Sequence, residues 1–154
     1  MLTSGEVALV HEVFGTAVDP QRVTIRRRKW FALHPRRVTM APTGHLYFHP
    51  AGTSYCDDFS QASPSLQGHF IHEMTHVWQS QTRGWWYVPL LGAVQRQYGY
   101  TIKPGKPLAS YGIEQQAEIV SHAFMLRRGW LVAGAAPLED YAGLVNFAAA
   151  ARLA

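Results

Sequence analysis

The sequence predicts a single α+β domain over residues 1–154, with a small twisted sheet packed on one long helix and further helices towards the C-terminus. Three observations predict this class. In the first third of the chain, apolar and polar residues alternate in short stretches, as they do in strands. Two later segments, 64–83 and 112–128, have apolar residues at helical spacing. A chain of 154 residues that is 47% hydrophobic and 16% charged can form one adequate core.

The first third of the chain is expected to supply one helix and the strands. Residues 2–14 have apolar side chains at helical spacing, and Gly15 is a typical helix end. Three predicted strands and a loop follow, at 22–26, 37–41, 45–49 and 51–63. The second and third strands would form a hairpin about a turn at 42–44. Residues 45–49 are the expected edge strand, which would pair with an extended substrate backbone.

Residues 64–83 are predicted to form the central helix. Ser63 is a candidate N-cap, Pro64 suits the first helical turn, and Gly84 is a typical end signal. Five apolar residues at helical spacing predict a core-facing side: Leu66, Phe70, Met74, Val77 and Trp78. At about 100° per residue, three histidines lie on roughly the opposite side: His69, His72 and His76.

Residues 72–76 read His-Glu-Met-Thr-His, the H-E-x-x-H pattern of zinc metallopeptidases. Positions i and i+4 share one helix face, so His72 and His76 can bind the same ion. Glu73 lies beside that face, where it can act as a general base on a water at the metal. The alternative is a buried helix with hydrogen-bonded histidines, and the two-sided pattern of the helix disfavours it.

A catalytic zinc site needs a third protein ligand, and the helix predicted at 112–128 offers one. Glu114, Glu118 and His122 follow one another at four-residue spacing along one side of this helix. We assign Glu114 as the third ligand. Glu118 would accept a hydrogen bond from the far ring nitrogen of His72 and so fix its orientation. The two glutamates can also exchange these roles, or be solvent-facing charges.

For the remaining segments the sequence predicts only general roles. Residues 85–110 are rich in aromatic residues, Gly and Pro, and they either wall the substrate cleft or form a satellite core. Three residues are candidates for stabilising the oxyanion of the reaction: Tyr98, Tyr111 and His122. Of these, His122 is the best placed by periodicity. Residues 137–153 predict an Ala-rich closing helix.

The two helical motifs together resemble the gluzincin metallopeptidases, in which H-E-x-x-H is joined by a glutamate on a later helix. Here the later segment reads E-x-x-A-E from Glu114 to Glu118. In thermolysin-like members the corresponding segment reads E-x-x-S-D, so Ala117 and Glu118 replace Ser and Asp. The resemblance implies a zincin-like fold with one zinc ion, and it carries the ligand role of the first acid over to Glu114.

A broader resemblance covers most of the chain and concerns the Vgr-related, Rhs-associated bacterial proteins. The stretches that carry it are 13–15, 26–31, 44–50, 72–79 and 114–120. These proteins are metallopeptidase-like domains tied to type VI secretion, some fused to the secretion spike and some free-standing. The resemblance implies an antibacterial or anti-host toxin. It also implies a secretion-spike protein or an immunity protein as possible partners.

The chain is basic, with a net charge of +4 and a pI of about 9.5. Basic residues cluster in its first third, at Arg22, Arg26, Arg27, Arg28, Lys29, Arg36 and Arg37. We interpret this cluster as a solvated strand and turn, in preference to a phosphate-binding patch. Attraction to an anionic bacterial envelope is a third interpretation. The single Cys56 excludes an internal disulfide and a cysteine-based zinc site.

The sequence also bears on location. It has no run of 18 apolar residues, so we expect no membrane span. Residues 1–10 lack the basic-then-apolar pattern of a secretory signal. We therefore expect synthesis in a bacterial cytoplasm and delivery by a secretion system to the target-cell periplasm or to a host cell.

The function expected from these features is zinc-dependent hydrolysis of peptide bonds through a zinc-bound water, in a toxin linked to type VI secretion. Two alternatives remain open. One is an amidase that acts on cell-wall peptides with the same water. The other is a non-catalytic secretion adaptor that retains the zinc site to stabilise its fold. Binding of nucleic acid is a weaker possibility.

Overall fold

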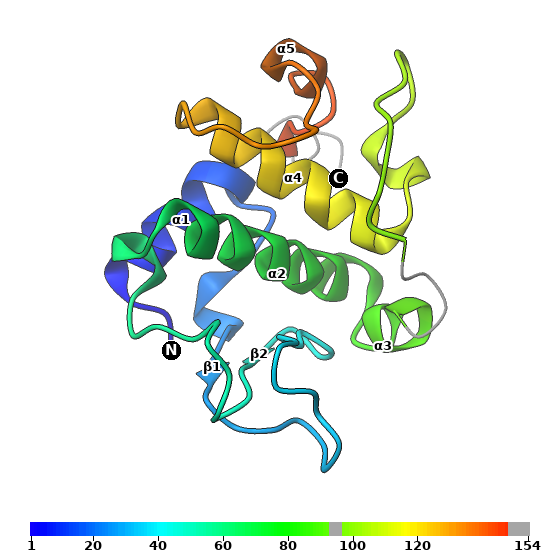
Figure 1. Ribbon diagram of the computed structural model, residues 1–154. Helices are drawn as coiled ribbons and strands as arrows, with labels where there is room; N and C mark the ends of the chain where they lie inside the picture. Colours follow the sequence, from blue (N-terminus) through cyan, green and yellow to red (C-terminus); the bar gives the residue numbers. More distant parts are fainter. Residues whose placement is uncertain (93–96, 148–154) are drawn as a thin grey trace.

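Two long helices form the centre of the molecule, which is a computed structural model that describes residues 1–92 and 97–147. The helices are α2, Pro64–Arg83, and α4, Ile113–Arg127, and they pack against each other along their length (Figure 1). Helix α1, Ser4–Phe14, and a small sheet lie on one side of α2, and α5, Leu138–Tyr141, lies against α4. A short helix α3 follows α2, at Tyr87–Gly92. The described part of the chain also has three single turns of 3₁₀ helix, at Pro20–Arg22, Phe59–Gln61 and Leu108–Ser110.

Helix α1 is fixed at both ends by its own sequence, close to the predicted bounds. Thr3 and Glu6 form a capping box, since the Glu6 amide donates to Thr3 Oγ1 and the Thr3 amide donates to Glu6 Oε2. The other carboxylate oxygen of Glu6 accepts from the amide of Phe59, 3.0 Å away. Gly15 ends the helix with a positive φ of 56°. A buried acid therefore ties α1 to the segment that leads into α2.

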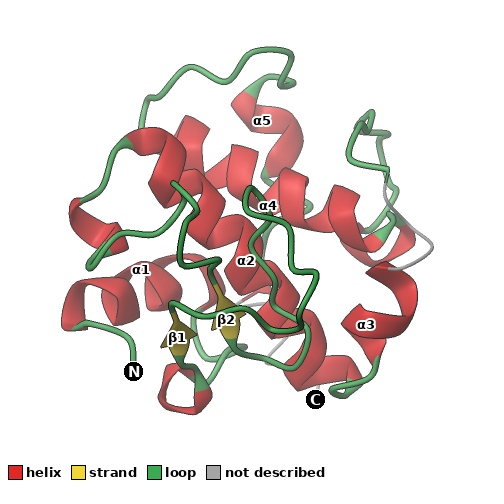
Figure 2. Ribbon diagram, turned by 60° about the horizontal axis from the view of Figure 1, so that its bottom comes forward, coloured by secondary structure: helices red, strands yellow, loops and turns green. Residues whose placement is uncertain are grey.

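The sheet is much smaller than predicted, and it differs from the prediction in one important respect. β1, Ile25–Arg26, pairs in parallel with β2, Leu46–Tyr47 (Figure 2). The predicted hairpin is reduced to a single antiparallel bridge between Met40 and Tyr47. β2 therefore has a partner on each side, and our expectation that 45–49 is an edge strand was wrong. The physical reason is that Leu46, Tyr47 and Phe48 form a continuous buried apolar run, which is typical of a central strand.

The apolar side of α2 is buried in the core as predicted, and α4 packs on the other side of α2, which carries Gly68 and His72. Phe70, Met74 and Val77 of α2 are fully buried. The side chain of Ser121 on α4 donates to the backbone carbonyl of Gly68 on α2, 2.8 Å away. A Cβ at Gly68 would meet the Met125 sulfur at 2.5 Å, so a glycine at this position allows the close approach of the two helices. The predicted ends of both helices are confirmed, at Pro64 and Gly84 and at Gly112 and Arg128.

The predicted closing helix at 137–153 is interrupted. α5 ends at Tyr141, the chain turns over residues 142–144, and Phe147 is again helical at the end of the described part, with Val145 and Phe147 buried against the core. Residues 148–154 lie outside the described part of the chain. Pro137 is the N-cap of α5, and Tyr141, its last residue, is completely buried. None of the described helices is long and apolar enough to cross a membrane.

Candidate metal centre

Three potential metal ligands converge where α2 and α4 face each other. His72 and His76 project from successive turns of α2, and Glu114 projects from the first turn of α4. Glu114 Oε2 lies 3.3 Å from Nε2 of His72 and 3.3 Å from Nε2 of His76. One ligand atom from each of the three residues lies within 4.8 Å of the others. The structure thus brings together the three residues that the sequence spacing singled out.

The spacing of these atoms fits a tetrahedral zinc ion. Ligands about 2.0–2.1 Å from such an ion stand roughly 3.3–3.4 Å from one another. Both measured separations to Glu114 Oε2, 3.3 Å each, match that edge and exceed the usual N–H···O hydrogen-bond length. Two imidazoles and a carboxylate are also the donor set that zinc accepts in hydrolases. The donors and their spacing therefore fit the metal that the sequence suggested.

The far nitrogen of each candidate histidine ligand has a partner of its own. Nδ1 of His72 lies 3.3 Å from Glu118 Oε1, as the sequence interpretation expected. Nδ1 of His76 lies 2.9 Å from Gln79 Oε1. Since these oxygens accept, each ring keeps a proton on Nδ1, and Nε2 is the nitrogen that faces Glu114 and would bind a metal. Both rings are therefore held in the tautomer that a metal site requires.

Gln79 was not found from the sequence. It is 1% exposed, and its Nε2 donates to the carbonyl oxygen of Ile113 and to Gln116 Oε1, each 3.1 Å away. Gln116 in turn donates to the carbonyl of Tyr111. The network joins α2 to the start of α4, just beside Glu114. The signal that would have revealed it is a glutamine three residues after the second histidine, on the histidine-bearing side of the helix.

Glu73, the candidate general base, is buried to 5% exposure beside the ligands. Its Oε1 lies 3.8 Å from Nε2 of His69, one turn earlier on α2. The same His69 nitrogen lies 2.7 Å from Oγ1 of Thr39, in the segment before β2. Burial lowers the pKa of His69, although the nearby Glu73 opposes that shift. A neutral imidazole held by Thr39 therefore flanks the carboxylate of Glu73.

Both ring nitrogens of His122, the residue predicted to stabilise the oxyanion, are engaged by other side chains. Its Nε2 is 3.0 Å from Glu118 Oε2, and its Nδ1 is 2.6 Å from the hydroxyl of Tyr100. Tyr100 in turn bonds to the hydroxyl of Tyr141, 2.7 Å away. Both ring nitrogens of His122 are thus occupied by protein groups on the far side of Glu118 from His72. This arrangement favours a role for His122 as a support for Glu118, and its role at the oxyanion stays a prediction.

The other two candidates for stabilising the oxyanion, Tyr98 and Tyr111, lie in different environments. Tyr98 lies with its ring stacked on His72 at a centroid distance of 6.3 Å, and its side chain is exposed. Tyr111 is buried, and its hydroxyl accepts from the amide of Lys103. Within this segment, Tyr98 therefore borders the candidate metal centre, whereas Tyr100 is partly buried against the core.

The electrostatics of the site reflect paired charges in a region of low solvent access. Burial disfavours the charged form of His72, but Glu114 and Glu118 outweigh it and raise the pKa of His72 to about 10. Burial also disfavours the ionised form of Glu114, but the two histidines lower the pKa of its carboxyl to about 2. Hydrogen bonds from His122 and His72 hold the pKa of Glu118 far below its ordinary value. Both acids are therefore anionic at neutral pH and suited to a cation.

Two hollows lie near the metal centre without including its ligands among their described lining residues. The larger, of about 530 Å³, lies beside α4 and is lined by Tyr100, Lys103, Lys106, Tyr111 and Gln115, among others. The smaller lies between the segment before β2 and the loop after it. We base the site on the convergence of ligands, because donor geometry identifies a metal centre more directly than concavity does.

Comparisons with known proteins give one consistent relative. No family model matches the chain. It is 40% identical over 132 residues to the type VI secretion system spike protein VgrG2b of Pseudomonas aeruginosa. The match includes 80% of this chain and 13% of that protein, so the chain spans a small part of its curated relative. Among solved structures, the effector domain of Pseudomonas aeruginosa VgrG2b is similar with a TM-score of 0.76 and 39% identity, over 82% of this chain and 74% of that one.

Proposed function

The chain belongs to the family of the VgrG2b effector domain of type VI secretion, and from that premise we propose that it is a zinc metallopeptidase. The observation that carries the proposal is the convergence of His72, His76 and Glu114, with Glu73 in sequence between the two histidines. Among the described residues this is the cluster whose donors match a catalytic zinc site.

The metal and the protein side chains would supply different parts of the reaction. Zinc bound there would bring the pKa of a water towards about 7 and polarise a peptide carbonyl. Glu118 and Gln79 orient the two imidazoles so that their Nε2 atoms face the metal position. The buried carboxylate of Glu73 accepts the proton of the attacking water and returns it to the leaving amine.

His69 packs beside the carboxylate of Glu73, on the side away from the candidate ligands. Because Thr39 engages Nε2 of His69, that ring is held 3.8 Å from Glu73 Oε1. We assign His69 a positioning role, in which it limits the directions that the Glu73 carboxylate can take. A carboxylate with one preferred direction is a better base for a water at a fixed position.

The proposal extends to architecture and biology. We propose that the helix pair α2 and α4 with its small sheet is a zincin-like domain. We also propose that the protein is a type VI effector, made in the bacterial cytoplasm and delivered to the periplasm of a target cell or to a host cell. Its proposed partners are a protein or peptide substrate, a secretion-spike protein and an immunity protein. Membership of the effector-domain family supports this part of the proposal.

Cleavage of a panel of proteins by the purified chain tests the activity. We expect wild-type cleavage, loss of cleavage after zinc chelation, and recovery when zinc is restored. Glu73→Gln is the matched variant, because glutamine has the same shape and cannot act as the base. It should keep zinc and lose at least about a hundredfold in rate.

Other results would reassign the site. A Glu73→Gln variant as active as the wild type would remove Glu73 from the mechanism. Digestion of purified peptidoglycan without cleavage of any protein would indicate the cell-wall amidase. Bound zinc with no hydrolysis of either, and with partner binding unchanged in Glu73→Gln, would indicate the adaptor.

A further inference from the structure

The segment between β1 and Met40, residues 27–38, is an exposed loop with an unusual surface, and we call it the basic loop. In Figure 1 it projects from the sheet at the end of the molecule opposite α5. All its residues are exposed except His34. Four of the exposed side chains are apolar: Trp30, Phe31, Leu33 and Val38. Leu33 is 83% exposed, so the apolar part of the loop faces outward and is not part of the core.

The loop is ordered around the buried His34. Nδ1 of His34 accepts from the amide of Trp30 at 3.2 Å, so Nε2 carries the proton and donates to the carbonyl of Val38 at 2.6 Å. One imidazole thus joins the two limbs of the loop. The ring of Phe31 stacks on His34, with 7° between their planes. The exposed aromatic residues are therefore presented on a fixed frame, which lowers the entropy cost of binding a surface.

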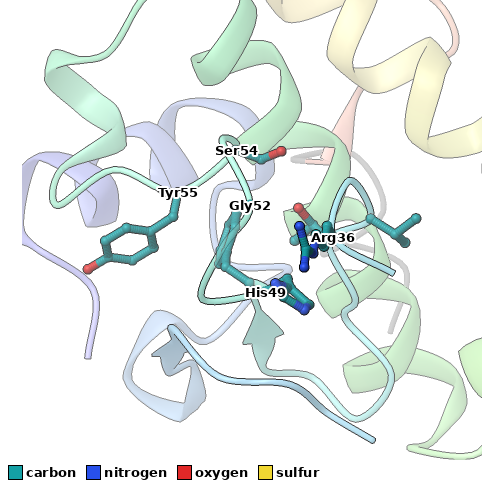
Figure 3. A pocket seen from close by; sticks show the side chains of 8 residues that line it. Arg36, His49, Gly52, Ser54 and Tyr55 are labelled. Atoms are coloured by element: carbon teal, nitrogen blue, oxygen red, sulfur yellow. The ribbon is translucent and has the colours of Figure 1, made fainter. Parts of the chain in front are cut away.

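The net positive charge of the chain comes from the region around this loop. Between Asp19 and Asp57 the sequence has seven Lys or Arg residues and no Asp or Glu. The rest of the chain has seven Lys or Arg against ten Asp or Glu, so it is negative overall. Lys29 and Arg37 stand on the loop itself, beside its apolar side chains. Figure 3 shows Arg36 directed towards the same hollow as His49, at the foot of the loop.

We propose that the basic loop docks the protein on the surface of an anionic phospholipid bilayer. Two complementary features of the loop fit such a surface. Lys and Arg are attracted to the negative headgroup layer, and Trp and Phe favour the boundary between headgroups and acyl chains. The aliphatic Leu33 and Val38 favour lipid over nucleic acid, since bases stack on aromatic rings and offer little to an aliphatic side chain.

Docking would also orient the metal centre relative to the bilayer. Thr39 directly follows the basic loop, and its hydroxyl bonds to His69 of α2. His69 lies one turn before the Glu73 end of the metal centre. The loop is thus connected through one side chain to the helix that carries the candidate ligands. The docking proposal itself does not depend on metal or on hydrolysis, and it can be tested without an activity measurement.

The test is sedimentation of the 154-residue chain with vesicles. Vesicles of phosphatidylethanolamine with phosphatidylglycerol and cardiolipin are compared with vesicles of pure phosphatidylcholine. We expect binding to the anionic vesicles that weakens as salt is raised, and little binding to phosphatidylcholine.

Two matched pairs of variants locate the surface. Lys29→Gln with Arg37→Gln should lower the partition coefficient about thirtyfold, at about fivefold for each charge. The control is Arg83→Gln with Lys103→Gln, which changes the net charge equally on other exposed positions. Leu33→Ser should weaken binding in the basic loop, and Leu131→Ser, which is 98% exposed elsewhere, should not. Circular dichroism checks that every variant is folded.

Vesicles with brominated acyl chains show which tryptophan enters the bilayer, because bromine quenches nearby indole fluorescence. We expect quenching that Trp30→Phe largely removes and Trp85→Phe leaves in place. Three results would overturn the proposal. The first is equal binding to both vesicle types, and the second is loss of quenching in Trp85→Phe alone. The third is tighter binding to single-stranded DNA than to vesicles, with no effect of Leu33→Ser, which would identify a nucleic-acid surface instead.

Discussion

Nδ1 of His76 lies 2.9 Å from the side-chain oxygen of Gln79, and this one hydrogen bond fixes which ring nitrogen faces Glu114. The orientation of the Gln79 amide is itself determined, because its nitrogen has two acceptors, the Ile113 carbonyl and Gln116 Oε1. The oxygen must therefore face His76. An amide performs for His76 the task that the carboxylate of Glu118 performs for His72. The candidate centre is thus supported from both helices.

Replacement of Gln79 by leucine should weaken zinc binding about 10- to 100-fold, because His76 would lose the partner that holds its tautomer. Loss of the two hydrogen bonds that Gln79 donates, to the Ile113 carbonyl and to Gln116 Oε1, should also reduce the free energy of unfolding by about 1–3 kcal/mol. A competition titration with a chromogenic chelator measures the affinity. Gln81→Leu is the control on the same helix, since Gln81 bonds to Asp19 and not to the site. Equal affinities in the two variants would show that Gln79 does not support the metal.

The two glutamates of α4 are distinguished by metal content. Glu114→Ala should lose zinc, because Glu114 Oε2 lies 3.3 Å from both histidine Nε2 atoms. Glu118→Ala should retain zinc with an affinity lowered about 10- to 100-fold, as expected for a group that orients a ligand. Elemental analysis of the purified variants gives the stoichiometry. The reverse pattern would exchange the roles of the two acids, and a wild type without zinc after reconstitution would contradict the metal centre.

Zinc binding near pH 7 should release about one proton. In the metal-free protein the neighbouring carboxylates raise the pKa of His72 to about 10 from an ordinary 6.5, so His72 is protonated at pH 7 and must lose that proton to bind a metal. Glu114, with its pKa lowered to about 2, is already ionised and contributes none. Affinity should therefore rise up to about tenfold per pH unit between pH 7 and pH 8.5.

Calorimetry in buffers of different ionisation enthalpy counts this proton. His72→Ala serves as the comparison, although its residual affinity will be low. The pairing of His72 with Glu114 and Glu118 also makes the stability of the metal-free fold depend on pH. The stability that it contributes is fully present below pH 6.5 and is lost as the pH rises through about 10, because the raised pKa favours the protonated form in the folded state. A proton count near zero would contradict a charged His72 in the metal-free protein.

His122→Ala should reduce the peptidase rate by less than about tenfold, because its two ring nitrogens are engaged by Glu118 and Tyr100. Loss of a group that contacts the oxyanion costs about a hundred- to a thousandfold in rate. Tyr98→Phe is the informative comparison, since the Tyr98 ring stacks on His72. Steady-state kinetics on one peptide substrate measures both variants. A hundredfold loss in His122→Ala with zinc retained would instead support the predicted catalytic role of His122.

Much of the candidate site could be predicted from the sequence because it depends on local geometry. His72 and His76 share a face of α2 through the four-residue repeat of a helix, and Glu114 and Glu118 share a face of α4 in the same way. The bounds of both helices were also predictable, since Pro64, Gly84 and Gly129 act through backbone conformation alone. These relationships involve residues within one turn of each other.

Other features depend on contacts between distant segments. The partners of β2 are decided by which segments lie beside it, and a two-residue strand holds too little sequence to specify them. The turn after α5 is another such case, because it buries Val145 and interrupts the helix that alanine propensity predicted. Propensity is a weak preference that core packing overrides.

The sequence by itself determined the two ligand-bearing helices and the residues on each of their faces, because each follows from spacing along one chain segment. Only the tertiary structure decided that Glu114 meets both histidines, that Gln79 supports His76 and that His122 stands behind Glu118. The physical reason is that a helix fixes the direction of a side chain about its own axis. The distance to a side chain on another helix is set by how the two helices pack, which here involves Gly68 and Ser121.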